Sequence, residues 1–407
     1  MTIRSTTRAQ RLTGLTFIAV TALTVAACGS GTSSSGGDST EPIKVGVVAP
    51  MQTIYGAWVK VGAEVGADQV NSNGGMNGRQ VEIIFGDSAG DPTKANTEMT
   101  RLVKQEKVDF ILGPMTSAES LATFPILNAA KIASAASAGS EKITPEVAPY
   151  GMAIHSTTRQ EITMMVTEIK KRGYQTVASI HDDGVFNMEG AGLLKEEADK
   201  VGLTVVGDQA YKIFSTDVSA QLTALKALNP DVLVALTTTD TGAVLLGRDQ
   251  LGWDVPIVGN QGVTGDIKGA KAVAGENGYH NTIGTVPTAF TACTDAEVNP
   301  ATKDYIAAAQ AKANAKPGEF NYFYASPMYD GLIWMDAAVD ATKKTDGPTV
   351  IKWIEENAAT EAENLPLSMT GWQFSATNHH ALSDDAFTLA DPTKPLGEGT
   401  FTRADCP

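Results

Sequence analysis

Short apolar runs alternate with amphipathic stretches along most of the chain after residue 42. Helical spacing of apolar residues occurs in residues 93–107, behind Asp91 as the N-cap and Pro92 at the first helical position, and in residues 217–228. The apolar runs are β-branched and nearly uninterrupted, which is typical of strands buried on both faces of a parallel sheet. The alternation predicts right-handed βαβ units in an open, doubly wound sheet. The predicted strands are residues 43–49, 80–86, 108–113, 176–181, 231–236 and 255–259.

The chain after residue 42 is too long for one such sheet. A single sheet saturates at roughly 150–250 residues, so a body of about 365 residues predicts two lobes. An apolar strand at residues 150–154 leads into a new helix at residues 160–172, which places the first break near residues 155–158. After Gly284 helical patterns dominate, and helices without strands of their own must pack on a sheet that is already built. The predicted lobes are residues 43–157 plus 286–366 and residues 158–285 plus 367–407, with crossings near residues 156–160, 284–288 and 364–370.

The first 42 residues have the features of an export signal followed by a tether. Residues 1–27 combine three arginines with a short apolar run that is below spanning length, as in a secretory signal peptide. The segment Val25-Ala26-Ala27-Cys28 also resembles a lipobox, in which Cys28 is acylated and becomes the new N-terminus. An ordinary signal peptide with an incidental cysteine is the alternative. Residues 28–42 are rich in Gly and Ser and predict a flexible tether, so we expect an extracytoplasmic body anchored to the cell membrane by a lipid on Cys28.

The net charge and the cysteine content further limit the partners and the covalent bonds that we expect for this chain. The formal net charge is -15, and removal of residues 1–27 takes away three arginines and no acid, which leaves −18. A surface this acidic repels phosphate backbones, so nucleic acid is not an expected partner. In an oxidising compartment Cys293 and Cys406 are expected to form a disulfide, with two buried free thiols as the alternative.

Sequence signatures of catalysis and cofactor binding are not found. The chain has no Gly-Lys dipeptide for a phosphate loop and no G-x-G-x-x-G after a strand, so no cofactor is expected. Five scattered histidines do not predict a metal site, and His379-His380 is interpreted as a polar surface turn. Asp182-Asp183 follows a predicted strand and is interpreted as a solvated loop or a helix cap. The chain is therefore not expected to be an enzyme, although an exported hydrolase using Ser117 or the Asp182-Asp183 pair remains an alternative.

An ordered series of motifs occurs at residues 43–49, 55–56, 62–64, 71–79, 87–92, 110–117, 137–140, 259–263 and 329–331. Together these motifs resemble the leucine/isoleucine/valine-binding family of periplasmic solute-binding proteins. The resemblance implies an α/β fold of periplasmic-binding-protein type I, in which two Rossmann-like lobes, each a doubly wound parallel sheet, are joined by three hinge crossovers. It also implies a monomeric protein that closes on a small polar organic solute, an amino acid or a related carboxylate or amide, and delivers it to an ABC permease. A ligand-sensing receptor that uses the same clamp is the alternative.

The resemblance assigns ligand contacts residue by residue. Ser117 ends a strand before an apolar-patterned helix, where a hydroxyl and free amides can receive a carboxylate. In the family, the segments that match Ser117 and the turn Ser137-Ala138-Gly139 hold the α-carboxylate; a simple N-cap and a simple turn are the alternatives. The remaining expected contacts are Phe186 and Thr237-Thr238 from the second lobe, and Tyr55, Met115 and Phe323-Tyr324 as pocket walls. For each aromatic residue among these, packing in the hydrophobic core is the alternative.

One position departs from the family pattern. Amino-acid-binding members carry an acid that pairs with the α-ammonium of the ligand, and this chain has Gln261 there. A hydrogen bond to a charged group contributes about 1.5–3 kcal/mol, against about 0.5–1.5 kcal/mol for a neutral one. Either another acid (Asp240, Asp182 or Asp266) therefore replaces it, or the solute lacks an α-amino group. On the sequence alone, a Gln261→Glu change should improve amino acid binding only if the pocket already admits amino acids.

Overall fold

The computed structural model describes residues 41–316 and 318–406. The predicted signal peptide, the predicted lipid attachment site at Cys28 and nearly all of the predicted tether lie outside the described residues. In the part that is described, no helix combines the length and the apolar character needed to cross a membrane.

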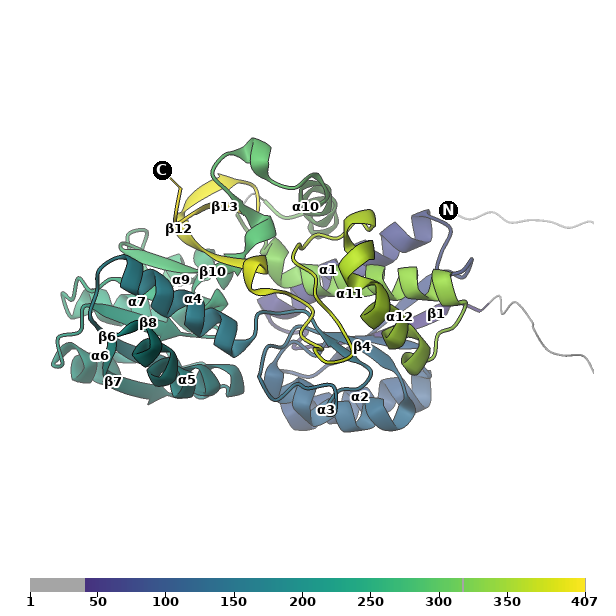
Figure 1. Ribbon diagram of the computed structural model, residues 1–407, viewed down its shortest axis with the longest axis horizontal. Coiled ribbons are helices and arrows are strands. Elements are labelled where there is room, and N and C mark those ends of the chain that lie inside the picture. Colours follow the sequence, from purple (N-terminus) through teal and green to yellow (C-terminus); the bar gives the residue numbers. More distant parts are fainter. Residues whose placement is uncertain (1–40, 317, 407) are drawn as a thin grey trace, which may run out of the picture. The chain divides into compact units, whose positions relative to one another are not determined.

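The first sheet is parallel throughout, with strand order β2-β1-β3-β4-β5. Helices α2 and α3 lie on one face and α1, α11 and α12 on the other (Figure 1). The packing of α1 against α11 is close, because a Cβ at Gly62 would lie 2.0 Å from the carbonyl oxygen of Ala325. The elements are β1 (Ile43–Ala49), α1 (Ile54–Ser72), β2 (Val81–Asp87), α2 (Pro92–Arg101), β3 (Phe110–Leu112), α3 (Ser117–Ala130), β4 (Ala133–Ala136), β5 (Gly151–Ala153), α10 (Pro300–Ala313), α11 (Tyr322–Thr342) and α12 (Gly347–Glu361).

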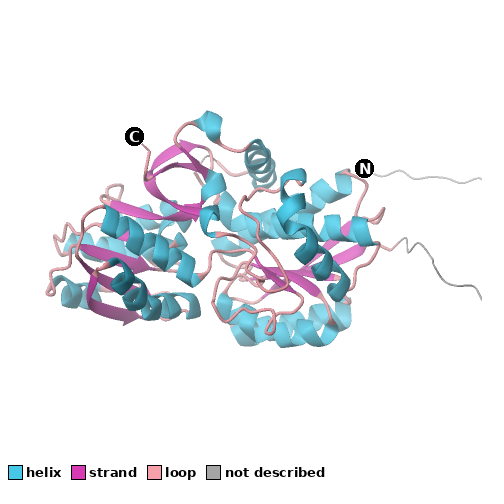
Figure 2. Ribbon diagram, viewed as in Figure 1, coloured by secondary structure: helices cyan, strands magenta, loops and turns pink. Residues whose placement is uncertain are grey.

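The second sheet has the strand order β11-β13-β12-β10-β9-β8-β6-β7. It is parallel except where β12 pairs with β10 and with β13. Helices flank this sheet as well (Figure 2). The elements are α4 (Thr158–Lys171), β6 (Thr176–Asp182), α5 (Val185–Val201), β7 (Thr204–Tyr211), α6 (Ser219–Lys226), β8 (Val232–Leu236), α7 (Thr241–Gln250), β9 (Ile257–Gly259), α8 (Gln261–Gly265), α9 (Ile267–Ala274), β10 (Thr282–Pro287), β11 (Thr291–Ala292), β12 (Phe387–Gly397) and β13 (Thr400–Arg403).

Both faces of the sheets are buried, as the apolar runs predicted. In β8, Leu233 and Ala235 pack with α6, α7 and α9, whereas Val232 and Val234 pack with α4 and α5. The fold class is therefore confirmed: two α/β sheets, each covered by helices on both faces. The predicted lobe boundaries remain a prediction. Strands β12 and β13 join the second sheet, while Trp372 lies in the hydrophobic core that surrounds α11.

The predicted disulfide is present. Cys293 and Cys406 are bonded, with their Cα atoms 5.5 Å apart. Cys293 follows β11 and Cys406 follows β13, and these two strands pair in parallel. The bond therefore fastens the C-terminal end of the chain to the edge of the second sheet.

The interpretation of His379-His380 as a surface turn is wrong. His379 is 1% exposed and His380 is 8% exposed. One ring nitrogen of His379 lies 2.8 Å from the carbonyl oxygen of Ala148, and the other lies 3.0 Å from a carboxylate oxygen of Glu355. This pair joins the 378–382 segment to α12. No group of three or more potential metal ligands occurs among residues 41–316 and 318–406.

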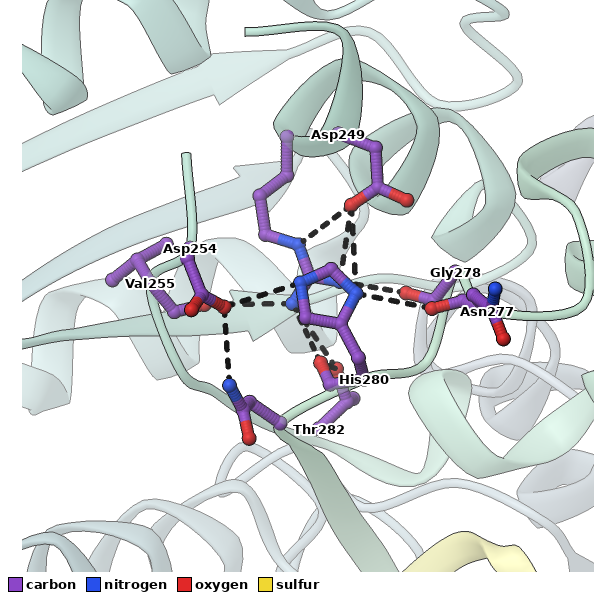
Figure 3. Close-up of polar contacts among 9 residues, drawn as sticks. Asp249, Asp254, Val255, Asn277, Gly278, His280 and Thr282 are labelled. Carbon is purple, nitrogen blue, oxygen red and sulfur yellow. Dashed lines mark hydrogen bonds and ion pairs between the residues drawn. The ribbon is translucent and has the colours of Figure 1, made fainter. Parts of the chain in front are cut away.

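A buried arginine joins α7 to the ends of two strands in the second sheet. The side chain of Arg248 is fully buried, and its guanidinium donates to the carbonyl oxygens of Gly278 (2.7 Å) and His280 (2.9 Å). The guanidinium also contacts the Asp249 carboxylate (3.3 Å) and the ring of His280 (2.9 Å), two of the residues whose polar contacts Figure 3 shows. Burial lowers the pKa of Arg248 from its ordinary value, and Asp249 acts in the opposite direction. Because Arg248 satisfies its own donors and the buried carbonyls together, it is a structural group.

Candidate functional site

Ser117 and the 137–140 turn meet at the N-terminus of α3. The Ser117 Oγ accepts hydrogen bonds from the backbone N–H of Gly139 (3.3 Å) and of Ser140 (3.2 Å). Ser117 is not the N-cap: that residue is Thr116, whose Oγ1 accepts from the Glu119 N–H. The Ser117 hydroxyl, two turn amides and the first free amides of a 14-residue helix therefore face one place.

The turn approaches the second sheet too closely to admit a side chain at Gly139. A Cβ there would lie 1.9 Å from the carbonyl oxygen of Ser156 and 2.7 Å from the ring of Phe186. Ser137 and Ala138 are buried beside it. The ring of Phe186 also packs edge-on against His155, with centroids 5.4 Å apart. Phe186 thus lies over the turn, at the start of α5.

Tyr55 connects the two sheets. Its hydroxyl, on α1, donates to the carbonyl oxygen of Thr238 at 3.1 Å, just after β8. The Tyr55 ring packs edge-on against Tyr324 at 5.6 Å. Burial raises the pKa of Tyr55 well above its ordinary value, so the hydroxyl remains a neutral donor. Met115 is half-buried against the core of the first sheet, and Phe323 is buried in that core.

A chain of amides orders the ends of the strands on the second-sheet side. Asn187 donates to Asp182 (2.8 Å) and to the hydroxyl of Thr238 (3.1 Å). Asn260 donates to Asn187 (2.8 Å) and accepts from the N–H of Thr237 (3.1 Å). The hydroxyl of Thr237 is 2.6 Å from that of Thr241, so it is directed toward α7. Thr238, whose carbonyl oxygen accepts from Tyr55, is therefore better placed than Thr237 to contact a solute between the two sheets.

The Asp182-Asp183 pair was only partly predicted. Asp182 is fully buried rather than solvated, and it accepts from the N–H of Gly184 (2.8 Å), the residue that precedes α5, without capping the helix. Asp183 accepts from the N–H of Ile213 at 2.8 Å. Burial raises the pKa of Asp182 from its ordinary value, and its hydrogen bonds with Asn187 and Gly184 oppose this.

Gln261 contacts an acid that the sequence analysis did not identify. Its Nε2 donates to the hydroxyl of Ser156 (2.7 Å) and to a carboxylate oxygen of Glu161 (3.1 Å). Glu161 lies in the first turn of α4 and is 1% exposed. Burial raises the pKa of Glu161 to about 7, and the hydrogen bonds with Ser156 and Gln261 oppose this. A signal was available in the sequence, because Glu161 is spaced at intervals of four from Met165 and Ile169, both of which are buried on the inner face of α4.

The structure thus brings most of the predicted residues together around the facing ends of the two sheets. Ser117, the 137–140 turn and Phe186 form one group, and Tyr55 and Thr238 form a second. Met115 makes no hydrogen bond through its side chain among the described residues.

The sequence matches the family described as periplasmic binding protein over residues 42–391. The chain belongs to the periplasmic binding protein family. A curated relative from Brucella melitensis, named Leu/Ile/Val-binding protein homolog 3, is 26% identical over 276 residues, which cover 66% of this chain and 72% of the relative. This periplasmic binding protein is accordingly similar to the Leu/Ile/Val-binding branch.

Solved structures give the same fold. A solute-binding protein of an ABC transporter from Rhodopseudomonas palustris, in complex with 4-hydroxybenzoate, superposes with a TM-score of 0.71 at 19% identity, covering 88% of this chain and 95% of that one. The branched-chain amino acid transporter substrate-binding protein LivJ from Streptococcus pneumoniae, in complex with isoleucine, gives 0.69 at 19% identity, covering 87% and 97%. These structures show that this periplasmic binding protein shares their fold, and the family model and the curated relative both describe binding proteins.

Proposed function

We propose that this protein is an extracytoplasmic lipoprotein that captures a small organic carboxylate between its two sheets and delivers it to an ABC permease. The observation that carries the proposal is the convergence of the Ser117 hydroxyl, the Gly139 and Ser140 amides and the N-terminus of α3. Helix N-termini with unpaired N–H groups favour anions. The solutes named for the two solved structures, isoleucine and 4-hydroxybenzoate, both carry a carboxylate.

Closure over the solute supports the same proposal. The hydrogen bond between Tyr55 and Thr238 joins an element of the first sheet to one of the second. Hinge motion at the predicted crossings near residues 156–160, 284–288 and 364–370 would open and close this contact. In the closed form, Phe186 would cover the solute and the Tyr55–Tyr324 pair would form a wall.

We also propose that the protein is attached to the membrane and acts beside a permease. A lipid on Cys28 and the tether of residues 28–42 would hold the body near the membrane face, where the permease lies. We propose a monomer with no cofactor. The alternative of an exported hydrolase gains no support from the geometry of Ser117, because in the described part of the chain its hydroxyl contacts backbone amides and no basic side chain.

Ser117→Ala is expected to weaken carboxylate binding by about 1–3 kcal/mol, since the hydroxyl would form a hydrogen bond with a charged group. Isothermal titration of wild type and variant with the same solute measures this change. Ser140→Ala is the matched control: it keeps the backbone N–H that faces Ser117 and should change the affinity less. Equal affinities for wild type and Ser117→Ala, with both proteins folded, would remove the carboxylate assignment.

A further inference from the structure

Beside the proposed carboxylate receptor lies a buried acid with one unpartnered oxygen. Glu161 uses Oε1 to accept from the Ser156 hydroxyl (2.5 Å) and from the Gln261 amide (3.1 Å). Its Oε2 is buried and receives no hydrogen bond from any described residue. A buried carboxylate oxygen without a donor is costly, because the lost hydration is not replaced. Glu161 is therefore prepared for a donor that the chain itself does not provide.

The acids considered from the sequence as substitutes for the missing family acid do not have this property. Asp182 accepts at both oxygens, from Gly184 and from Asn187. Asp240 also accepts at both, from Thr239 and from the Phe214 N–H, at distances of 2.7–3.2 Å. Asp266 caps α9 through the Gly269 N–H. These carboxylates are occupied by backbone and side-chain donors.

Two further acids, Glu119 and Asp336, each have a buried oxygen without a partner among the described residues, and both lie on helices of the first sheet, α3 and α11. Glu119 is fully buried, and its Oε1 has no partner among the described residues. Its other oxygen accepts from Thr116, the N-cap of its own helix. The neighbours that act on its pKa are Ser88, Thr116 and Asp91, all within the segment that forms the first sheet. Glu161 instead lies on α4 in the second sheet's segment, where it contacts Gln261 at the start of α8 and Ser156 beside the 137–140 turn.

Glu161 is also adjacent to the proposed carboxylate receptor. Ser156 contacts both groups. Its hydroxyl donates to Glu161, and its carbonyl oxygen would lie 1.9 Å from a Cβ at Gly139. The N–H of Thr158, at the start of the same helix as Glu161, donates to the carbonyl oxygen of Gly139 at 2.9 Å. The amides of Gly139 and Ser140 in turn face Ser117. The 137–140 turn thus contacts both Ser117 and the start of the helix that carries Glu161.

We propose that Glu161 is the counter-charge for a cationic amino group of the solute, so that the solute is a zwitterionic amino acid. The inference rests on the proposed function and adds the second functional group of the solute. An ammonium carries three donors and a positive charge, which matches an unpartnered carboxylate oxygen. None of the described lysines and arginines forms a hydrogen bond or ion pair with Glu161, so the chain leaves this charge to the solute.

Gln261 then has a different role from the one suggested by the family pattern. It does not receive the ammonium; its Nε2 donates to Glu161 and orients that carboxylate. In this chain the acid lies on α4, and the amide lies at the start of α8, where the family pattern has an acid. A single Gln261→Glu change would place two carboxylates within about 3 Å and should force them to share a proton. It should therefore fail to improve amino acid binding.

The test is isothermal titration with matched pairs of solutes. Each α-amino acid in the panel is paired with the carboxylic acid that lacks only the amino group, such as valine with 3-methylbutanoate and phenylalanine with 3-phenylpropanoate. We expect at least one amino acid to bind wild type ten times more tightly than its partner. Glu161→Gln should remove at least tenfold of the amino acid affinity and leave the affinity for the partner acid within threefold. The exchange variant Glu161→Gln/Gln261→Glu should restore the preference.

Two controls locate the effect. Glu168→Gln removes a charge from the same helix, where that carboxylate pairs with Arg172, and should leave the preference unchanged. Asp240→Asn should also leave it unchanged, because both oxygens of Asp240 are occupied; a loss of preference there would move the role to Asp240 and overturn the assignment. Tighter binding of the plain carboxylic acids by wild type, or an equal effect of Glu161→Gln on both solutes, would overturn it while the proposed function stands. Binding of neither class would contradict both.

Discussion

Gly139→Ala is expected to weaken solute binding at least tenfold and to lower the free energy of unfolding by about 1–3 kcal/mol. The new methyl group would lie 1.9 Å from the carbonyl oxygen of Ser156 and 2.7 Å from the Phe186 ring. The first contact is with backbone, so the turn itself must move away from the 155–156 segment. That movement shifts the N–H groups of Gly139 and Ser140 away from Ser117, which is where we place the carboxylate.

The matched control is Gly192→Ala in α5. A Cβ at Gly192 meets nothing within 4 Å, and alanine favours a helix over glycine by about 1 kcal/mol. This variant should bind as wild type does and be equally stable or slightly more so. Titration calorimetry and urea unfolding of both variants give the two quantities. An unchanged affinity in Gly139→Ala would show that the turn does not hold the solute.

Arg248→Met is expected to lower the free energy of unfolding by about 3–5 kcal/mol, the range for breaking a buried, charged hydrogen-bond network. Methionine retains the apolar length but provides no donor. The carbonyl oxygens of Gly278 and His280, which now accept from the guanidinium at 2.7 and 2.9 Å, would lose this donor (Figure 3). The loss should be structural, so the affinity of the remaining folded protein for solute should change little.

Arg172→Met provides the comparison for Arg248. The side chain of Arg172 is 37% exposed and pairs with Glu168 on the surface of α4. An exposed pair of this kind contributes about 0–1 kcal/mol, so its loss should be small. Urea denaturation of both variants measures the difference. A loss below about 1 kcal/mol for Arg248→Met would mean that water or other donors replace the guanidinium.

The sequence predicted strands where apolar pattern and burial coincide. β1, β6 and β8 are β-branched and buried on both faces, and the structure places them within one or two residues of the expected bounds. β4 was missed because its sequence, ASAA, has no β-branched residue. β7 was missed because it is a half-exposed edge strand whose sequence, TVVGDQAY, is interrupted by Gly, Asp and Gln.

In the C-terminal region, strand formation and burial depend on contacts with distant parts of the chain, which a local sequence pattern does not contain. β12 contains Asp, Lys and two prolines, and it forms a strand because β10 and β13 are available as partners. His379 resembles a surface residue in sequence, and its burial depends on Ala148 and Glu355, both distant along the chain. Pairings of this kind are set by tertiary packing, which a local window does not contain.

The same limit applies to the candidate site. The placement of Ser117 beside the 137–140 turn could be anticipated, because a strand end followed by a helix start gives the position of each. The spacing of Glu161 from Met165 and Ile169 indicates its burial on α4. Its contact with Gln261 joins residues 100 positions apart, and nothing local to either residue indicates that contact. The charge that seemed to be missing at position 261 is present on another helix.

The most direct test of the central claim, a solute carboxylate held at the N-terminus of α3, is a thermal-shift screen of the folded protein with amino acids and short carboxylic acids. A solute that binds only the folded form stabilises it by about 2.7 kcal/mol at a hundredfold excess over its Kd. We predict a raised melting temperature with at least one member of the panel, and a smaller shift with the same solute in Ser117→Ala. A flat response from the folded wild-type protein across the whole panel would contradict the account.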